Sequence, residues 1–447
     1  MKKILVLGAG RTATSLIEYL IGEAEENNWF VTVGDFSLEL AAEKVGGAGR
    51  AKAIKFDIND EEIRKREISA ADVVVSYLPP KLHPIAAKEC LECYTHLITA
   101  SYVSASMMEL DREARGKGLI FLNEMGLDPG IDHMDIMSLL SKIKSEGGRP
   151  VSIKSSCGGL IAPESDNNPW GYKFTWSPMN VVLAGQNNAK YIKNSQTHFV
   201  PYNRLFLEID PVQIPGQGNF ESYPNRDSLP YLIQYGVKDV RDFYRGTLRR
   251  PGYAAAWNAL IQMGLTDHER CFDNSAGMTY KEWVNSLNPS LKGDDPEAEL
   301  SEFLGVPADS DIINKILWLD LFREEKIGLA SATSAGILLK LLEDKWNFEE
   351  DEHDLVILRT EIEYETGKKK KKITSTMTCT GRDKIHTAMT LTGGLPAGIG
   401  AKLILEGNIK EKGVIIPVHT DIYEPVLEEL KRLGISFNEE QRQLSAA

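Results

Sequence analysis

The sequence predicts an α/β fold that begins with a dinucleotide-binding domain, and three observations lead to this prediction. Short apolar runs recur through the first 125 residues, and segments with helical spacing separate them. Such strands are typical of a parallel sheet that helices cover on both faces. A glycine-rich turn follows the first run, at the position where such domains bind phosphates. The composition, with 42% hydrophobic and 26% charged residues, is that of a globular protein.

These runs also give the order of the elements. Strands are expected at residues 4–7, 30–33, 53–56, 73–78, 96–99 and 119–122, with helices at 12–27 and 38–45. Later strands are expected at 151–155, 204–208, 355–365 and 373–380. Residues 253–345 are predicted to be helical, 368–372 to form a solvated hairpin tip, 393–398 to break the chain and 424–433 to form the last helix.

The charge of the chain limits its partners. The 51 Lys and Arg residues and 64 Asp and Glu residues give a net charge of −13, which excludes a general nucleic-acid binder. No window approaches about 18 consecutive apolar residues, so no membrane contact is expected. The five cysteines are too few for a disulfide framework, and Cys90 and Cys93 lack a second pair at zinc spacing. We therefore expect a soluble cytoplasmic protein without a metal site.

The turn after the first strand has the spacing of a dinucleotide-binding fingerprint, G-x-G-x-x-A. Its residues are Gly8, Ala9, Gly10, Arg11, Thr12 and Ala13. The first glycine permits the tight turn, the second lets the backbone approach a pyrophosphate, and the small Ala13 lets the helix pack against the strand. The free N–H groups at the start of the next helix attract the phosphates. A bound dinucleotide is therefore expected.

Asp35, at the end of the second strand, carries the expectation about the cofactor. A carboxylate there accepts hydrogen bonds from the ribose hydroxyls of NAD and repels the 2′-phosphate of NADP. No basic residue lies in residues 34–37, so NAD is favoured, while Arg11 leaves NADP possible. Further cofactor contacts are expected from Phe36, Ser37, Asp57, Ile58, Leu78, Leu127, Asp128 and Phe174.

Six segments beyond this turn resemble the L-glutamate-forming saccharopine dehydrogenases, also called saccharopine reductases. They are TASY at 99–102, NEMGLDPGIDH at 123–133, SCGGLIAPE at 156–164, GYKFTWS at 171–177, YPNRDS at 223–228 and RGTLR at 245–249. The similarity continues to residues 407–417. The chain departs from the NADP-using fungal members at the second strand, where they carry an arginine and this chain has Asp35 and Phe36.

The resemblance implies a reaction and a division of the chain. The reaction is the reversible NAD(P)-dependent oxidation of saccharopine to glutamate and 2-aminoadipate 6-semialdehyde, in the synthesis or the degradation of lysine. Residues 1–125 with 395–447 are expected to form the Rossmann domain, and 126–245 with 346–394 an α/β substrate-binding and dimerisation domain. Residues 246–345 are expected to form a small helical domain. A homodimer is also implied.

Saccharopine carries three carboxylates, so its site needs fixed cations, and an arginine can bind a carboxylate through two parallel hydrogen bonds. Arg226 and Arg249 lie in the matching motifs, within a stretch from 226 to 250 that has six basic and three acidic residues. Ligands of open α/β sheets bind beyond the carboxyl ends of the strands. The other residues expected to contact substrate are Ser101, Tyr102, Asp128, Cys157, Gly159, Thr247 and Leu248.

Oxidation of an amine requires a deprotonated nitrogen, so a base or water has to remove a proton. Asp128, in a Pro-Gly turn after the sixth strand, is the first candidate for this role, followed by His133 and Tyr102. We expect orientation of cofactor and substrate to supply much of the rate.

Two other functions fit parts of the sequence. A dehydrogenase acting on another amine conjugate, such as carboxynorspermidine, would need acidic residues for a cationic tail in place of Arg226 and Arg249. A nucleotide-binding scaffold without turnover would bind NAD and form no NADH from saccharopine.

Overall fold

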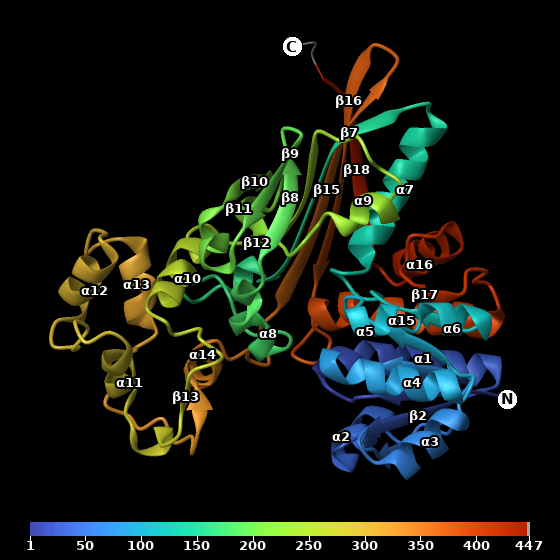
Figure 1. Ribbon diagram of the computed structural model, residues 1–447, viewed down its shortest axis with the longest axis horizontal. Helices are drawn as coiled ribbons and strands as arrows, with labels where there is room; N and C mark the ends of the chain where they lie inside the picture. Colours follow the sequence, from blue (N-terminus) through green and yellow to red (C-terminus); the bar gives the residue numbers. More distant parts are fainter. Residues whose placement is uncertain (445–447) are drawn as a thin grey trace. The chain divides into compact units, whose positions relative to one another are not determined.

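The computed structural model describes residues 1–444 and divides into two units (Figure 1). Unit 1 contains Met1–Val151 and the described residues from Leu358 onward, and unit 2 contains Ser152–Ile357. Strands β7 (Arg149–Ile161) and β15 (Asp354–Thr366) run through the two points of division. Unit 1 is therefore assembled from both ends of the chain.

Unit 1 contains a seven-stranded parallel sheet with the order β17-β6-β5-β4-β1-β2-β3. Its strands are β1 (Lys2–Leu7), β2 (Trp29–Asp35), β3 (Ala51–Lys55), β4 (Val73–Ser76), β5 (His96–Thr99), β6 (Ile120–Leu122) and β17 (Gly413–Ile415). The strand order reverses between β1 and β4, as in a Rossmann fold. The predicted fold class is therefore confirmed.

Helices cover this sheet because its central strands are apolar on both faces; all four residues of β4, for example, are buried. The helices that connect or follow these strands are α1 (Thr14–Asn27), α2 (Leu38–Val45), α3 (Glu61–Ser69), α4 (His83–Glu92), α5 (Ala105–Met108), α6 (Asp111–Gly116), α15 (Ala388–Glu406) and α16 (Thr420–Arg432). Cys90 is a free, buried thiol in α4 and packs within the apolar core.

Helix α15 differs from what the sequence predicts. The break expected at residues 393–398 is wrong, because the helix continues through this segment with Pro396 inside it. Its glycines permit close packing instead: a Cβ on Gly394 would lie 2.9 Å from the carbonyl oxygen of Thr12. Among the described residues, α15 is the one helix long and apolar enough to cross a membrane. However, 72% of its apolar window is buried, and it packs against α1.

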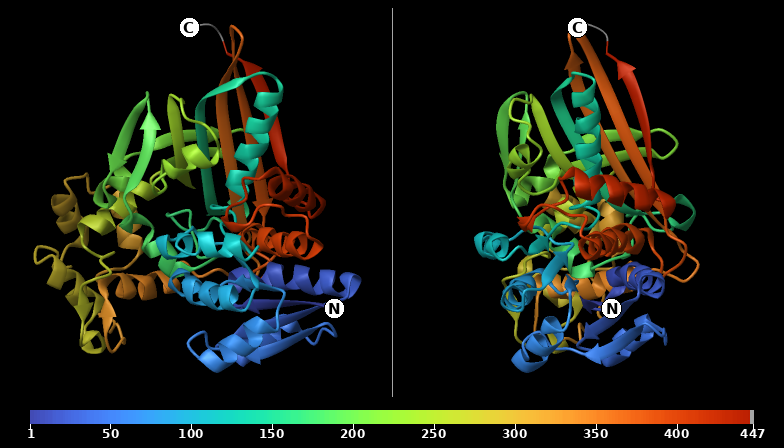
Figure 2. Two further views of the ribbon diagram at one scale, coloured as in Figure 1. Left: turned by 45° about the vertical axis from the view of Figure 1, so that its right-hand side comes forward. Right: turned by 90° about the vertical axis from the view of Figure 1, so that its right-hand side faces the viewer.

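Unit 1 also holds strands of a second sheet. Strand β16 (Lys369–Thr380) pairs antiparallel with β18 (Phe437–Gln443). Helix α7 (Ile131–Ser145) lies beside these strands in both views of Figure 2. The hairpin expected between β15 and β16 is present, but the expected lysine tip at 368–372 is only partly correct. Four of the five lysines form the start of β16 instead of the turn.

Unit 2 contains the strand order β10-β11-β12-β7, with β8 and β9 beside β12. Its further strands are β8 (Ala189–Lys193), β9 (Gln196–Val200), β10 (Asp210–Ile214), β11 (Gly218–Pro224), β12 (Asp242–Arg249), β13 (Cys271–Phe272) and β14 (Ala332–Thr333). Its α-helices are α8 (Pro178–Val182), α9 (Pro230–Gln234), α10 (Tyr253–Gln262), α11 (Tyr280–Leu287), α12 (Pro296–Leu304), α13 (Asp311–Trp318) and α14 (Ser334–Lys345). The separate domain expected at 246–345 stays a prediction.

An aromatic core holds the sheet and helices of unit 2 together. The rings of Trp257 and Trp346 lie 5.5 to 6.2 Å from that of Trp170, and all three side chains are buried. The strand expected at 204–208 is wrong, because Tyr202–Leu207 form a 3₁₀ helix. The adjacent residues Leu205 and Phe206 are both buried, which the alternation of a half-buried strand does not allow.

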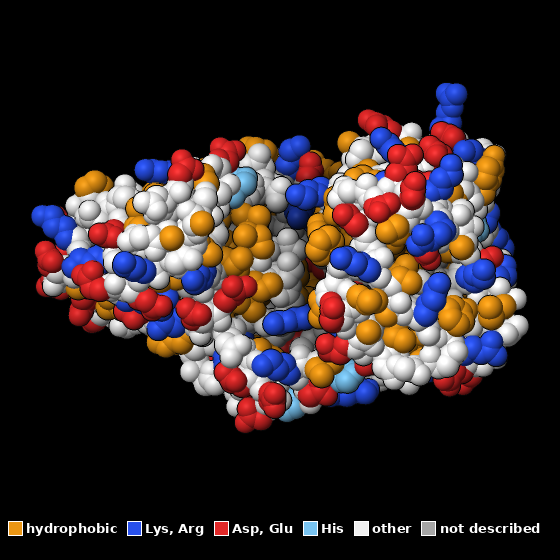
Figure 3. All heavy atoms as spheres, turned by 90° about the horizontal axis from the view of Figure 1, so that it is seen from below, with side chains coloured by type: hydrophobic (Ala, Val, Ile, Leu, Met, Phe, Trp, Pro, Cys, Tyr) orange, Lys and Arg blue, Asp and Glu red, His pale blue; other side chains and the backbone are white. Residues whose placement is uncertain are grey.

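The surface carries charges of both signs. On the face drawn in Figure 3, acidic and basic side chains are interspersed over both units. Both signs are also abundant in the composition, with 64 acidic and 51 basic residues.

Candidate active site

The glycine-rich turn between β1 and α1 has the geometry that a dinucleotide requires. Gly8 has a φ of +101°, and a Cβ there would lie 2.9 Å from the carbonyl oxygen of Tyr77. A Cβ on Gly10 would instead meet no atom within 4 Å. The fold itself therefore needs glycine at position 8, whereas glycine at position 10 leaves the backbone open to a ligand. Arg11 is exposed, Thr12 half-buried and Ala13 buried.

Asp35 links this turn to the start of α2. Its Oδ2 accepts a hydrogen bond from the N–H of Ala9 at 2.7 Å, and its Oδ1 accepts one from the N–H of Ser37 at 2.9 Å. The Ser37 hydroxyl caps α2 by accepting from the N–H of Leu40 at 3.2 Å. Both carboxylate oxygens therefore have donors within the protein, a role that the sequence pattern does not reveal.

The other predicted cofactor contacts of unit 1 follow the same sheet. Phe36 is 70% exposed, with the Nζ of Lys55 5.6 Å from its ring centroid. Asp57 shapes the turn after β3, because its Oδ1 accepts from the backbone N–H two residues later at 2.9 Å. Ile58 and Leu78 belong to the apolar cluster on one face of the sheet.

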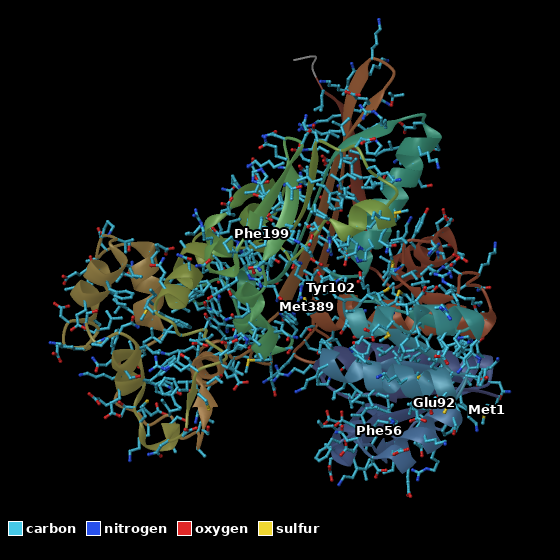
Figure 4. The ribbon with its side chains drawn as sticks, viewed as in Figure 1. Met1, Phe56, Glu92, Tyr102, Phe199 and Met389 are labelled. Carbon is cyan, nitrogen blue, oxygen red and sulfur yellow. The ribbon has the colours of Figure 1, made fainter. Side chains whose placement is uncertain are left out.

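Tyr102 and Asp128 come together beyond the carboxyl ends of the strands. The Tyr102 hydroxyl, after β5, donates to the Oδ1 of Asp128, in the turn before α7, at 2.9 Å. Both residues are half-buried, whereas Leu127 is buried. Figure 4 shows Tyr102 and Met1 at opposite sides of unit 1, with Met1 at the amino ends of the strands. The pair thus lies at the edge of the sheet where ligands bind in this fold.

His133 is fully buried at the start of α7 and contacts carboxylates. Its Nε2 is 2.8 Å from the Oε2 of Glu124, and its Nδ1 is 3.6 Å from the Oδ2 of Asp132. The other carboxylate oxygen of Glu124 accepts from the N–H of Val103 at 3.0 Å. Glu124 therefore links His133 to the loop that carries Tyr102 and helps to hold this loop in place. These contacts favour a supporting role for His133 over direct proton transfer.

Sequence reasoning missed a second histidine in this region. His83, the first residue of α4, has its Nδ1 2.9 Å from the Oγ of Ser76. Its Nε2 is 2.9 Å from the Oγ of Ser101 and 3.0 Å from the Oγ1 of Thr99. Burial lowers the pKa of His83 to about 4. No motif marks His83, because only the sheet brings its partners from β4 and β5 together.

Arg249, at the end of β12, is a buried cation in unit 2. Its guanidinium carbon lies 4.8 Å from the ring centroid of Tyr172, 5.3 Å from that of Tyr253 and 6.0 Å from that of Tyr223. Its Nη1 donates to the carbonyl oxygen of Leu248 at 2.8 Å, and its Nε has no hydrogen-bond partner among the described residues. Within this described part of the chain, no carboxylate forms an ion pair with Arg249.

The carboxylate opposite Arg249 in the sheet is engaged elsewhere. Glu221 of β11 is the register partner of Arg249. Its two oxygens accept from the N–H groups of Gly252 at 3.0 Å and Ala254 at 2.5 Å, at the start of α10. Burying a guanidinium without a compensating anion costs free energy. The N–H donors of Arg249 are therefore suited to a carboxylate that a ligand supplies.

Strand register places other predicted substrate residues near Arg249. Thr247 of β12 lies between Cys157 of β7 and Tyr223 of β11. Gly159 lies two residues beyond Cys157 on β7. Arg226, with a φ of +55°, is exposed in the segment after β11. Three neighbouring strands therefore carry residues that the sequence shows only as separate motifs.

Two predicted contacts pack within unit 2. The Leu248 side chain is fully buried in an apolar cluster and lies on the opposite face of β12 from Arg249. The Phe174 ring lies 5.2 Å from that of Trp346, within the aromatic core. A ligand contact of Leu248 would therefore have to use its backbone. All the predicted site roles stay predictions.

Two family models match the chain. Residues 4–122 match the saccharopine dehydrogenase NADP binding domain, and residues 126–435 match the saccharopine dehydrogenase C-terminal domain. The chain belongs to the saccharopine dehydrogenase family. Membership confirms the resemblance seen in the sequence and makes the protein an oxidoreductase of this family.

Individual relatives agree with this assignment. The saccharopine dehydrogenase (NADP(+), L-glutamate-forming) of Pyricularia oryzae is 32% identical over 449 residues, which cover 98% of each chain. The mitochondrial alpha-aminoadipic semialdehyde synthase of Mus musculus is 32% identical over 447 residues, 98% of this chain and 47% of that protein. The solved structure of apo histidine-tagged saccharopine dehydrogenase (L-Glu forming) from Saccharomyces cerevisiae matches with a TM-score of 0.87 at 31% identity, covering 99% of this chain and 100% of that one.

The comparisons correct the expectation about the cofactor. The matching N-terminal family model is an NADP-binding domain, and the Pyricularia relative is named for NADP(+). The preference for NAD that the sequence predicted from Asp35 is therefore wrong. The structure gives a physical reason, because the carboxylate is already bound by the N–H groups of Ala9 and Ser37. Its position alone does not make it a ribose acceptor.

Proposed function

We propose that this saccharopine dehydrogenase family member oxidises saccharopine to L-glutamate and L-2-aminoadipate 6-semialdehyde with NADP⁺, and catalyses the reverse condensation. The observation that carries the proposal is Arg249, which is 4% exposed and has no carboxylate partner in the described chain. A substrate with three carboxylates supplies the missing anion.

Recognition of the substrate is proposed to centre on Arg249. Its planar guanidinium can bind a carboxylate through two parallel hydrogen bonds, and each charge-assisted bond contributes about 1.5–3 kcal/mol. The rings of Tyr172, Tyr223 and Tyr253 exclude water and stabilise the cation through their π faces. Arg226 is exposed and adds a second cation for another carboxylate.

The cofactor is proposed to bind along the turn from Gly8 to Ala13. The open space at Gly10 and the free backbone N–H groups that follow fit a pyrophosphate. When bound, the nicotinamide supplies the acceptor for a hydride from the carbon next to the bridging nitrogen of saccharopine.

Proton transfer is assigned to the hydrogen-bonded pair of Tyr102 and Asp128. The pair lies at the carboxyl edge of the sheet, and Asp128 can take the proton of the bridging amine directly or through the Tyr102 hydroxyl. The proton removed is one of the two on the protonated bridging nitrogen, so loss of this proton and of hydride from the adjacent carbon leaves an iminium on the substrate. Water adds to this iminium, and the carbinolamine collapses to the aldehyde and the amine of glutamate.

The test follows the absorbance of reduced nicotinamide with saccharopine and NADP⁺, with NAD⁺ in parallel. We expect saccharopine-dependent NADPH formation. Arg249→Met should raise the KM for saccharopine at least about tenfold, because truncating one partner of a desolvated charge pair costs about 2–5 kcal/mol. Arg250→Met is the matched control, since that neighbouring side chain instead lies over Phe220, 4.8 Å from the ring centroid. No turnover of saccharopine, or a normal KM in Arg249→Met, would contradict the proposal.

A further inference from the structure

His83 has no role in the chemistry proposed above, although it contacts a predicted substrate residue. The side chain is 4% exposed, and its two ring nitrogens face hydroxyl groups from β4, β5 and the loop after β5. Ser76 and Thr99 are almost fully buried, whereas Ser101 is half-buried. Ser101 is thus the partner of His83 that a ligand can reach.

His83 is a neutral imidazole at physiological pH. Burial lowers its pKa to about 4, and its hydrogen-bond partners are the hydroxyls of Ser76, Thr99 and Ser101. A neutral imidazole offers one N–H donor and one acceptor nitrogen. Because a hydroxyl can serve either role, the ring connects Ser76 on one side to Ser101 and Thr99 on the other without adding charge.

These contacts restrict both the backbone and the side chain of Ser101. Its Oγ lies 2.9 Å from the Nε2 of His83, and its N–H donates to the Oγ1 of Thr99 at 3.2 Å. A serine hydroxyl has one donor and two acceptor positions, so in the tautomer whose Nε2–H donates to its Oγ, Ser101 keeps its own proton to donate to a ligand carboxylate. The hydroxyl is therefore fixed in orientation and still able to bind.

We propose that His83 is a positioning residue for substrate binding, which holds the Ser101 hydroxyl ready to donate to a carboxylate of the substrate. This inference rests on the proposed function, because the ligand it names is saccharopine. A hydroxyl that is already oriented loses less rotational freedom when the ligand binds. Ser76 anchors the far side of the ring and so keeps its Nε2 aimed at Ser101.

A pair of conservative variants separates this role from a merely structural one. In His83→Gln the side-chain amide reaches roughly the place of Nε2, whereas in His83→Asn it reaches roughly the place of Nδ1. His83→Gln should keep the KM for saccharopine within about twofold, and His83→Asn should raise it about tenfold, as for one lost hydrogen bond to a charged group. The KM for NADP⁺ should be unchanged in both.

A double-mutant cycle with Ser101→Ala completes the test. Because His83 acts through Ser101, His83→Asn should have no further effect on the KM in the Ser101→Ala background. Equal KM values in the Gln and Asn variants, or additive losses in the double variant, would overturn the inference. If His83→Asn does not fold, a normal KM in Ser101→Ala overturns it instead. Wild-type protein without saccharopine-dependent NADPH formation would refute the proposed function itself.

Discussion

At the scale of single residues, the two oxygens of Asp35 stabilise two neighbouring segments at once. One accepts from Ala9 in the glycine-rich turn, and the other accepts from Ser37 at the start of α2. A carboxylate that accepts hydrogen bonds from backbone N–H groups forms charge-assisted bonds, which are stronger than neutral ones. The conformation of the glycine-rich turn therefore depends on a residue 26 positions later in the chain.

Replacing Asp35 should weaken cofactor binding whichever nicotinamide cofactor is offered. Asp35→Ala leaves the N–H groups of Ala9 and Ser37 without their acceptor, so the KM should rise about tenfold for NADP⁺ and for NAD⁺, as for one or two lost charge-assisted bonds. The measurement is initial rates at saturating saccharopine. Asp60→Ala is the control, because Asp60 accepts from the N–H of Ile63 at the start of α3 and not from the glycine-rich turn. An unchanged KM for both cofactors would show that Asp35 does not support the turn.

At the scale of elements, close contact between α15 and α1 brings a C-terminal helix against the glycine-rich turn. A Cβ on Gly394 would lie 2.9 Å from the carbonyl oxygen of Thr12 and 3.1 Å from the N of Leu16. A Cβ on the adjacent Gly393 would meet nothing within 4 Å. Close packing of the two helices therefore requires glycine at position 394 and not at position 393, although both residues lie in α15.

Alanine substitutions at these two positions should have opposite effects on stability. Gly394→Ala forces the helices apart and should cost about 1–3 kcal/mol, as overpacking of a core does. Gly393→Ala adds no clash and should stabilise the helix by up to about 1 kcal/mol, because alanine has the higher helix propensity. Thermal melting of the two variants and the wild type provides the measurement. A Gly394→Ala variant that melts at or above the wild-type temperature would show that the contact is not tight.

Periodicity predicts the central Rossmann strands well, because their apolar runs are buried on both faces, whereas the edge strand β3 has no buried residue. The same reasoning fails at residues 393–398, where glycine serves contact between helices, and at 204–208, where two adjacent side chains are buried. In both cases the deciding factor is what packs against the segment. That information lies elsewhere in the chain, so local sequence patterns do not contain it.

At the scale of the whole molecule, sequence motifs identify candidate site residues only where those residues lie close together in the sequence. The turn from Gly8 to Ala13 and the motif around Arg249 can be predicted in this way. His83 could not be, because its partners come from β4, β5 and the loop after β5. The role of Asp35 was missed for the same reason.

Unit 1 depends on contacts between distant segments, and one of them contains a buried acid. Asp135 of α7 is 3% exposed, and its Oδ1 accepts from the hydroxyl of Ser375 on β16 at 2.7 Å. Its Oδ2 has no hydrogen-bond partner among the described residues. Burial raises the pKa of Asp135 to about 7, and Glu439 and Asp132 add to this effect, while hydrogen bonds from Thr360 and Ser375 oppose it.

This raised pKa makes the stability of the fold depend on pH in a defined direction. An unfolded aspartate has a pKa of about 3.9, so between about pH 4 and pH 7 the folded state holds a proton that the unfolded chain has lost. The stabilisation that this bound proton gives the folded state is complete below about pH 4 and is lost as the pH rises through about 7. Asp135→Asn cannot titrate, so its melting temperature relative to wild type should rise between about pH 5 and pH 8, by the equivalent of roughly 1–3 kcal/mol. Glu25→Gln, an exposed position on α1, should show the same difference from wild type at both pH values. A constant difference for Asp135→Asn across this range would mean that Asp135 keeps one protonation state in the folded protein.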